Sequence, residues 1–319
     1  MVDVTMENAE RHEICSEEDS YPELLLQIEL PPQRLYILGN PDSVKSGLAI
    51  VGARKATPYG ISCAERFAGI AAQLGITVIS GGAIGCDQAA HRGALESGGN
   101  TVVVLGSGAD VAYPKRGKGL FDSVLSAGGA LISELEWGTS PQKWAFRKRN
   151  RIIAGLSRAV LIVEAGLPSG TFSTADFALD AGREVLVVPG SIFSRESKGS
   201  NTLLLQGAVP VIDDVSFVDA MGRLFGSAFE NQGCQDGRCA GDGALNPQAS
   251  GIRLGLDGPQ TRIMKMLAAS PMTADQVIEC TGMSPMDSMR TISSLEAKKL
   301  VVRYPDGRFG IDSDIAKMI

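Results

Sequence analysis

The sequence has 319 residues, of which 44% are hydrophobic and 21% are charged, and its formal net charge is −6. These fractions are typical of globular proteins and exclude an intrinsically disordered chain. No apolar stretch is as long as a membrane-spanning helix, and residues 1–20 lack the basic and then apolar pattern of a signal peptide. We therefore expect a cytoplasmic protein without a membrane partner.

Composition divides the chain into four parts. Residues 1–20 are polar and acidic, which predicts a flexible tail. Residues 21–225 alternate short apolar runs with stretches of helical periodicity, as in a globular domain. Residues 226–257 are rich in Gly, Asn and Gln and lack periodicity, which predicts a flexible linker, and residues 258–319 form a second, smaller unit.

Buried β-strands are predicted within residues 21–225 by short runs rich in valine and isoleucine. Most of these runs lack alternation, as expected for strands covered on both faces of a parallel sheet. They are Leu48–Val51, Ile76–Ile79, Val102–Leu105, Ala130–Ile132, Ala159–Val163 and Val185–Val188, with an edge strand at Val209–Ile212. Helix-length stretches separate several of them, at Pro58–Leu74, Asp87–Ser97, Phe121–Ala127 and Thr171–Ala181. This order predicts an α/β fold with an extended, doubly wound, Rossmann-like and mostly parallel sheet.

Glycine-rich loops follow four of the predicted strands, at residues 52–54, 80–85, 106–108 and 169–171. The carboxyl ends of parallel strands meet at one edge, where glycine lets backbone amides and helix N-termini approach an anion. The loops therefore predict a site for more than one phosphate, and the alternative is that their glycines only make tight turns. The fingerprint of dinucleotide-binding proteins is incomplete, and that of nucleoside-triphosphate-binding proteins is absent, so we expect no cofactor.

A strongly basic stretch at residues 143–151 contains five cations and two aromatic residues without a carboxylate. Cations neutralise phosphates, and aromatic rings stack on unpaired bases. The stretch therefore predicts a groove for single-stranded nucleic acid. The alternative is a solvated helix face that pairs with acidic residues elsewhere.

Few residues have the spacing of a catalytic or metal site. His91 follows Asp87 by one helical turn, which suits a proton-transfer pair but is more often a helix cap beside a buried histidine. Cys234 and Cys239 have no histidine near them, and the six cysteines are scattered, as expected for reduced thiols. We therefore expect a binding protein with no metal, and no enzyme.

The C-terminal unit has the pattern of a small winged helix. Residues 273–281 and 285–297 predict a helix-turn-helix with Gly282 in the turn, and a β-hairpin is predicted around Asp306 and Gly307. The second helix mixes acidic and basic residues. A weak contact with duplex DNA and a contact with another protein both remain open for this unit.

A series of motifs along residues 21–319 resembles the DNA-processing protein A family (DprA or Smf). The motifs occur in the family's order, and the stretch from Arg149 to Ser157 is the most specific of them. They include Gly52-Ala53-Arg54, Thr57-x-Tyr59-Gly60, Ser80-Gly81, Asp87, Ala90-His91-x-Gly93-Ala94-Leu95, Asp110-x-x-Tyr113-Pro114, Ser133-Glu134, Val163-Glu164-Ala165, Ser169-Gly170-Thr171, Gly182-Arg183, Val188-Pro189-Gly190 and Gly199-x-Asn201.

This resemblance implies a dimeric protein that binds single-stranded DNA, protects it from nucleases and loads the recombinase RecA during natural transformation, DNA uptake and recombination. It implies no catalysis. Carried over by position, the implied strand contacts are Arg54, Lys143, Phe146, Arg149 and Asn150, with Ser169, Gly170 and Thr171 lining the same pocket. For Arg151, an ion pair with Glu164 or Asp176 inside the fold is an equal alternative.

Two departures from the family's pattern bear on this site. Ile84 stands where the family usually has an arginine, and Arg147 replaces the usual proline. We expect Arg147 and Lys148 to compensate for the lost charge, which adds Lys148 to the predicted DNA-binding residues.

Proteins of two other classes offer alternative functions. The first is a Rossmann enzyme of the phosphoribohydrolase type that activates cytokinins, whose loop reads Pro-Gly-Gly-x-Gly-Thr-x-x-Glu. Residues 168–171 lack the spacing and the glutamate of that loop. The second is a DNA-anchoring module acting through the winged helix, which the mixed charge of its second helix disfavours.

Overall fold

The structure is a computed structural model that describes residues 4–230 and, in the C-terminal part, residues 259–260, 263–264, 267, 272–281, 283–298, 300–303 and 309–311. Contacts divide the chain into two units, Met1–Asp236 and Gly237–Ile319. Each unit is described by itself.

The first unit is built on one large sheet, which has nine strands in the described part of the chain, in the order β1-β2-β6-β5-β4-β3-β7-β8-β9. In this order, neighbouring strands from β6 to β9 are parallel. The strand β2 pairs antiparallel with both β1 and β6. The central strands are buried along their whole length, which explains their uninterrupted apolar sequences. The strands are β1 (Arg11–Cys15), β2 (Arg34–Gly39), β3 (Gly47–Val51), β4 (Thr77–Ser80), β5 (Thr101–Val104), β6 (Ala130–Ser133), β7 (Ser157–Ile162), β8 (Glu184–Val187) and β9 (Val209–Pro210).

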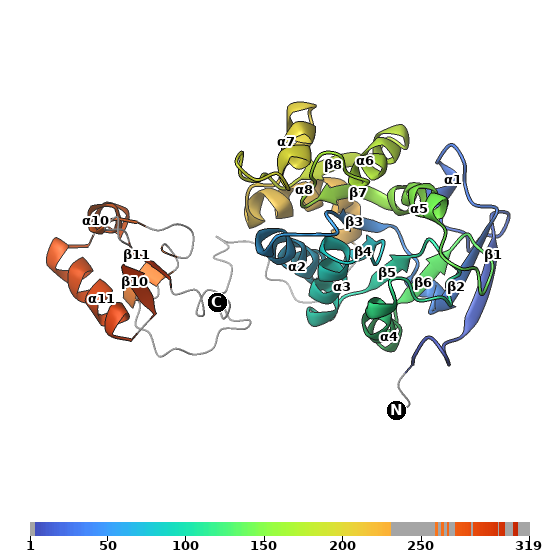
Figure 1. The fold of residues 1–319 in the computed structure, drawn as a ribbon, viewed down its shortest axis with the longest axis horizontal. Helices are drawn as coiled ribbons and strands as arrows, with labels where there is room; N and C mark the ends of the chain where they lie inside the picture. Colours follow the sequence, from blue (N-terminus) through green and yellow to red (C-terminus); the bar gives the residue numbers. More distant parts are fainter. Residues whose placement is uncertain are drawn as a thin grey trace. The chain divides into compact units, whose positions relative to one another are not determined.

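Helices cover both faces of this sheet (Figure 1). One face packs against α1, α5, α6 and α7, and the other against α2, α3, α4 and α8. The arrangement confirms the predicted doubly wound α/β fold. The helices are α1 (Glu23–Leu26), α2 (Pro58–Gln73), α3 (Cys86–Glu96), α4 (Lys118–Ser126), α5 (Lys143–Gly155), α6 (Thr171–Asp180), α7 (Lys198–Leu205) and α8 (Asp214–Glu230), with short 3-10 turns at Pro41–Ser43 and Lys115–Gly117.

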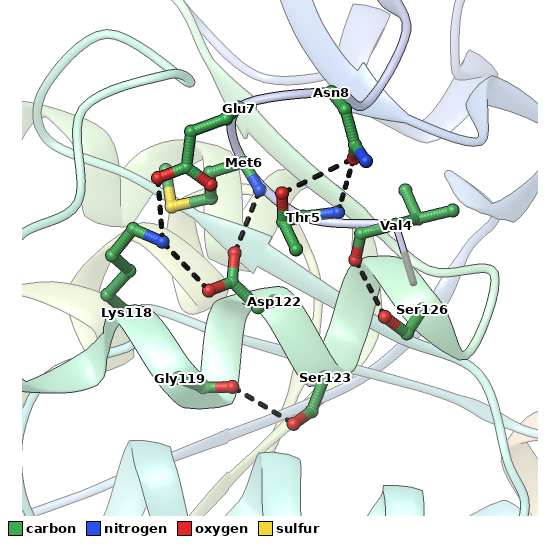
Figure 2. A network of polar contacts seen from close by, with 10 residues as sticks. All are labelled: Val4, Thr5, Met6, Glu7, Asn8, Lys118, Gly119, Asp122, Ser123 and Ser126. Carbon is green, nitrogen blue, oxygen red and sulfur yellow. Dashed lines mark hydrogen bonds and ion pairs between the residues drawn. The ribbon is translucent and has the colours of Figure 1, made fainter. Parts of the chain in front are cut away.

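Residues 4–15 pack onto the sheet and α4, so the prediction of a flexible tail is wrong for this part of residues 1–20. The strand β1 pairs antiparallel with β2, and Met6 is buried against the sheet. Figure 2 shows the segment before β1 bound to α4, where the Met6 amide donates to Asp122 at 2.8 Å and the Ser126 hydroxyl donates to the Val4 carbonyl at 2.6 Å. The polar composition of this segment reflects bonding to a helix surface.

The boundary between the units falls within the predicted linker. The helix α8 continues to Glu230, five residues past the predicted end of the first domain at 225. The rest of the predicted linker, with Cys234 and Cys239, lies outside the described residues.

The second unit contains the predicted helix-turn-helix, formed by α10 (Ala274–Thr281) and α11 (Pro285–Ala297). The strands β10 (Val301–Arg303) and β11 (Phe309–Ile311) pair antiparallel, as expected for the wing. Ser284 caps α11 by accepting a hydrogen bond from the Asp287 amide. The predicted turn residues Gly282, Asp306 and Gly307 lie outside the described residues.

Candidate functional site

A cavity of about 800 Å³ opens at the carboxyl ends of β3 and β7. These adjacent strands mark the point where the strand order reverses, because β4 and β5 lie to one side and β8 and β9 to the other. Ligands of doubly wound proteins bind at such a switch point. The cavity is lined by the loop after β3, by α5, by the start of α6 and by residues 195–196.

Eight of the nine predicted DNA-binding residues line this cavity, although they come from three separate stretches of sequence. Lys148 is the exception. The eight are Arg54, Lys143, Phe146, Arg149, Asn150, Ser169, Gly170 and Thr171.

Positive charge dominates the rim. In the part of the chain that the structure describes, five exposed cations line the cavity, and they are Arg54, Lys55, Lys143, Arg147 and Arg195. Three acidic side chains, Asp87, Asp176 and Glu196, also line it. Sequence reasoning missed Lys55, which its neighbour Arg54 could have indicated, and Arg195, which no motif marks.

Arg149 forms the floor of the cavity and is only 5% exposed. Its guanidinium donates to the carbonyl of Gly81 at 2.8 Å and to the carbonyl of Val104, which joins the ends of β4 and β5. Burial lowers the pKa of Arg149 to about 10, although the nearby Asp87 carboxylate acts in the opposite direction. Its predicted contact with DNA stays a prediction, and the geometry favours a role in positioning the loops.

The start of α2 and the loops beside α3 are already occupied by the protein's own carboxylates. Glu164, which is 2% exposed, accepts hydrogen bonds from the Thr57 amide at 2.8 Å and from the Thr57 hydroxyl at 2.7 Å. Asp87 accepts from the amides of Gly52, Gly81 and Ala83. Burial raises the pKa of Asp87, while Arg149 and these amides lower it. We predicted that these two loops bind phosphates. In the structure, carboxylates of the protein accept the hydrogen bonds there.

The N-termini of α5 and α6 are open by comparison. Neither has an acidic residue in its first turn or, among the described residues, a side-chain cap. At α6, the Ser169 hydroxyl accepts from the Thr171 amide at 3.2 Å. The Asn150 amide group donates to the Ser173 hydroxyl at 2.9 Å, which joins α5 to α6. With no carboxylate there, the positive ends of both helix dipoles face the cavity, although the first amides of α6 are bonded within the protein to Ser169 and Gly170.

The Phe146 ring is half-buried at the side of the cavity. Its centroid lies 5.1 Å from that of the Tyr113 ring and 5.8 Å from the guanidinium carbon of Arg54. A Cβ atom at Gly106 would lie 2.8 Å from the Phe146 ring, so this position requires glycine. One part of the ring is thus fixed by the protein, and the other part faces the cavity.

Lys148 and Arg151 lie on another side of α5. Both form ion pairs with Glu134, and the Nζ atom of Lys148 lies 3.1 Å from its Oε2 atom. Arg151 is buried, and the alternative of an ion pair inside the fold is right, but the partner is Glu134 rather than Glu164 or Asp176. No spacing in the sequence indicates this pair, because Glu134 follows β6, 17 residues before Arg151.

His91 is fully buried on α3 and is bonded to Thr101 at 2.7 Å. Because the Thr101 hydroxyl donates to the Val78 carbonyl, it accepts from Nδ1–H of His91. Burial lowers the pKa of His91 to about 3, so the ring is neutral. The structure therefore agrees with the alternative to a proton-transfer pair, in which His91 is a buried residue that makes a hydrogen bond in the core.

Within the described ranges, no group of three or more His, Cys, Asp or Glu residues has the arrangement of a metal site. The same ranges contain no helix that is long and apolar enough to cross a membrane. The predicted absence of a metal stays a prediction, because Cys234 and Cys239 lie outside these ranges.

The fold and the cavity define a Rossmann-like α/β protein with a cationic ligand site at its switch point. The chain belongs to the DNA recombination-mediator protein A family, whose model matches residues 12–222. A second model, the DprA winged helix domain, matches residues 247–307. Both matches confirm the resemblance noted in the sequence.

Similar proteins come from several bacteria. Protein Smf of Synechocystis is 32% identical to this chain over 93% of it and 79% of that protein. The X-ray structure of DNA processing protein A from Streptococcus pneumoniae has a TM-score of 0.61 and 36% identity, covering 65% of this chain and 73% of that one. The Helicobacter pylori DNA processing protein A, described by its single-stranded DNA binding mode, has a TM-score of 0.61 and 28% identity over 67% of this chain and 97% of that one.

Proposed function

We propose that this protein binds single-stranded DNA in the cavity at the carboxyl ends of β3 and β7. In this proposal it protects the strand and loads RecA during DNA uptake and recombination, acting as a cytoplasmic homodimer without catalysis. The observation that carries the proposal is the convergence of five exposed cations and the Phe146 ring on one cavity.

The distribution of charge supports a polyanionic ligand. The exposed cations come from the loop after β3, from α5 and from the loop before α7, so they surround the cavity rather than follow one edge. A flexible chain of phosphates reaches such groups in succession. The start of α6, which has no acidic residue in its first turn, adds the positive end of a helix dipole.

The position of Phe146 supports a single strand over a duplex. Its free part faces into the cavity beside Arg54. A base reaches this ring only when it is unpaired and turned out of a helical stack. The Helicobacter relative, described for binding single-stranded DNA, agrees with this choice of ligand.

The rival enzyme function has less support. In the phosphoribohydrolase loop, a glutamate stands three residues after the threonine. Here Thr171 is followed at that distance by Thr174, which is buried. The position that matches this glutamate therefore has no carboxylate.

Fluorescence anisotropy tests the binding proposal, with labelled oligo-dT and a labelled duplex at two salt concentrations. If about four phosphates are bound, log affinity falls with log salt with a slope near −3, since each phosphate of a single strand contributes roughly 0.7. Phe146→Ala is expected to weaken oligo-dT binding by about 1–3 kcal/mol, the usual contribution of one stacked base. Salt-independent binding or a preference for duplex would refute the proposal.

RecA loading needs a separate experiment. RecA filament formation is followed on a single strand coated with a single-strand-binding protein, with and without this protein. We expect faster filament growth with the wild type and none of that gain with Phe146→Ala. An equal gain from both proteins would show that strand binding in the cavity is not how loading occurs.

A further inference from the structure

The exposed surface of α5 extends beyond the cavity. Lys143, Phe146, Arg147 and Asn150 recur at three- and four-residue intervals and all line the cavity. Trp144 lies about 100° further around the helix than Lys143, with Lys148 one turn after it. A strip of cations and one indole ring therefore runs from the cavity over the outer side of α5.

Trp144 has the exposure of a binding residue. It is 57% exposed, and its indole N–H has no hydrogen-bond partner among the residues that the structure describes. Trp137 provides a contrast within the same protein. That ring packs at right angles to Tyr36 with centroids 5.4 Å apart, and its N–H donates to Glu13 at 3.0 Å. Trp137 is held by the fold, whereas the Trp144 ring faces solvent.

The charge beside Trp144 suits a phosphate. The Nζ atom of Lys148 lies 5.8 Å from the Trp144 ring centroid. Lys148 shares its acidic partner, Glu134, with the buried Arg151, so one carboxylate faces two cations. Arg147, on the neighbouring strip of the helix, forms no ion pair within the described part of the chain. The outer side of α5 therefore keeps a surplus of positive charge.

We propose that Trp144 and Lys148 form a second nucleotide-binding site, at which an unpaired base stacks on the indole and its phosphate is bound by the lysine. A strand that fills the cavity then continues across α5 instead of ending there. This inference rests on the proposed function, because it extends the path of the same strand.

The occupant follows from the residue types. An exposed indole with a cation close to its ring is the combination that nonspecific single-strand sites use, since every base has a face to stack. Lys148 beside the indole ring supplies the cation for the phosphate of the stacked base.

Intrinsic fluorescence tests the proposal directly, because the chain has two tryptophans. In a Trp137→Phe variant, the emission comes from Trp144 alone. We expect an oligo-dT of about twelve nucleotides to quench this emission to saturation, and one of about four nucleotides, long enough only for the cavity, to leave it nearly unchanged. Unchanged emission while a labelled twelve-nucleotide strand binds would overturn the proposal.

Affinities of two variants complete the test. Trp144→Ala should weaken binding of the longer oligo-dT about tenfold and leave the shorter one unaffected, whereas Trp144→Phe should retain most of the affinity. Urea unfolding confirms that both variants fold. Equal affinity of all three proteins for the longer strand would refute the second site while leaving the cavity intact. Failure of the wild type to bind any strand would refute both proposals.

Discussion

At the carboxyl edge of the sheet, the half covered by α2 and α3 differs from the half covered by α5 and α6 in where the protein places its own carboxylates. On one side, Glu164 accepts hydrogen bonds at the start of α2, and Asp87 in the first turn of α3 accepts from loop amides. On the other side, α5 and α6 begin without an acidic residue, and basic side chains stand beside them. The first half is closed and fixed by internal hydrogen bonds, and the second is open to a ligand.

This difference shows that a glycine-rich loop before a helix is not by itself an anion site. Whether it binds a ligand depends on residues far away in the sequence, such as Glu164, which lies 107 residues from Thr57. Substitutions in the closed half should therefore mainly lower the stability of the protein. Substitutions in the open half should mainly lower its affinity for DNA.

The largest effect is expected from Arg149→Leu, because this side chain reaches from α5 to the carboxylate and carbonyls of the closed half. The change leaves the buried Asp87 carboxylate without its cation and two carbonyls without their donor, so the free energy of unfolding should fall by about 3–5 kcal/mol. Urea denaturation followed by circular dichroism measures it. Arg66→Leu, which breaks a largely exposed pair with Asp214, is the control and should cost less than about 1 kcal/mol. Similar losses in both variants would contradict the closed arrangement.

Glu164→Gln should have the next largest effect. The variant keeps the size of the side chain but removes the charge that accepts two hydrogen bonds at the start of α2, so we expect a loss of about 1–3 kcal/mol in the same denaturation experiment. Oligo-dT affinity should not fall. Glu65→Gln, in a partly exposed pair with Arg92, should cost less than about 1 kcal/mol. A stable Glu164→Gln protein with weakened DNA binding would place Glu164 in the ligand site.

Acidification should destabilise the closed half through His91. The pKa of His91 is about 3 in the folded protein and 6.5 without perturbation. Between these two pH values, His91 binds a proton in the unfolded chain and not in the folded protein. Stability from the neutral ring is complete above pH 6.5 and is lost as pH falls towards 3, by up to about 1.4 kcal/mol per pH unit. Asp87 acts in the opposite direction because its pKa is raised.

Unfolding free energies of the wild type and His91→Gln, measured at several pH values, separate the two groups. The difference between the proteins should shrink as pH falls below 6.5. A constant difference would mean that His91 does not titrate with folding.

The smallest effect is expected in the open half, from Lys143→Gln. Lys143 lines the cavity and has no ion pair within the described residues, so its removal should reduce the magnitude of the salt slope by about 0.7 and leave stability unchanged. Lys45→Gln is a matched control, because exposed Lys45 precedes β3 and so lies at the opposite edge of the sheet. Equal slopes for both variants would remove Lys143 from the phosphate path.

Much of this organisation is visible in the sequence. All seven predicted strands form, because runs such as Leu48–Val51 are buried on both faces and so leave an uninterrupted apolar signal. The convergence of Arg54, Lys143 and Thr171 on one cavity follows from the rule that parallel strands end at a common edge. The strand β1 could not be predicted, because RHEIC sits at the edge of the sheet, where charged residues are tolerated. The burial of Arg149 could not be predicted either, because no local sequence pattern distinguishes it from its exposed neighbours Arg147 and Lys148.

The margins of the central sheet have a consequence for the proposed homodimer. At one margin, β1 presents Arg11 and Glu13, which form ion pairs with Asp110 and Arg34. At the other margin, β9 has two residues, and the second is Pro210, which lacks an amide proton. Charges, brevity and proline are the means by which proteins prevent edge-to-edge aggregation. A strand from another molecule therefore pairs poorly with either edge of the sheet. We expect the proposed homodimer to form through side chains of the helices rather than by adding strands to the sheet.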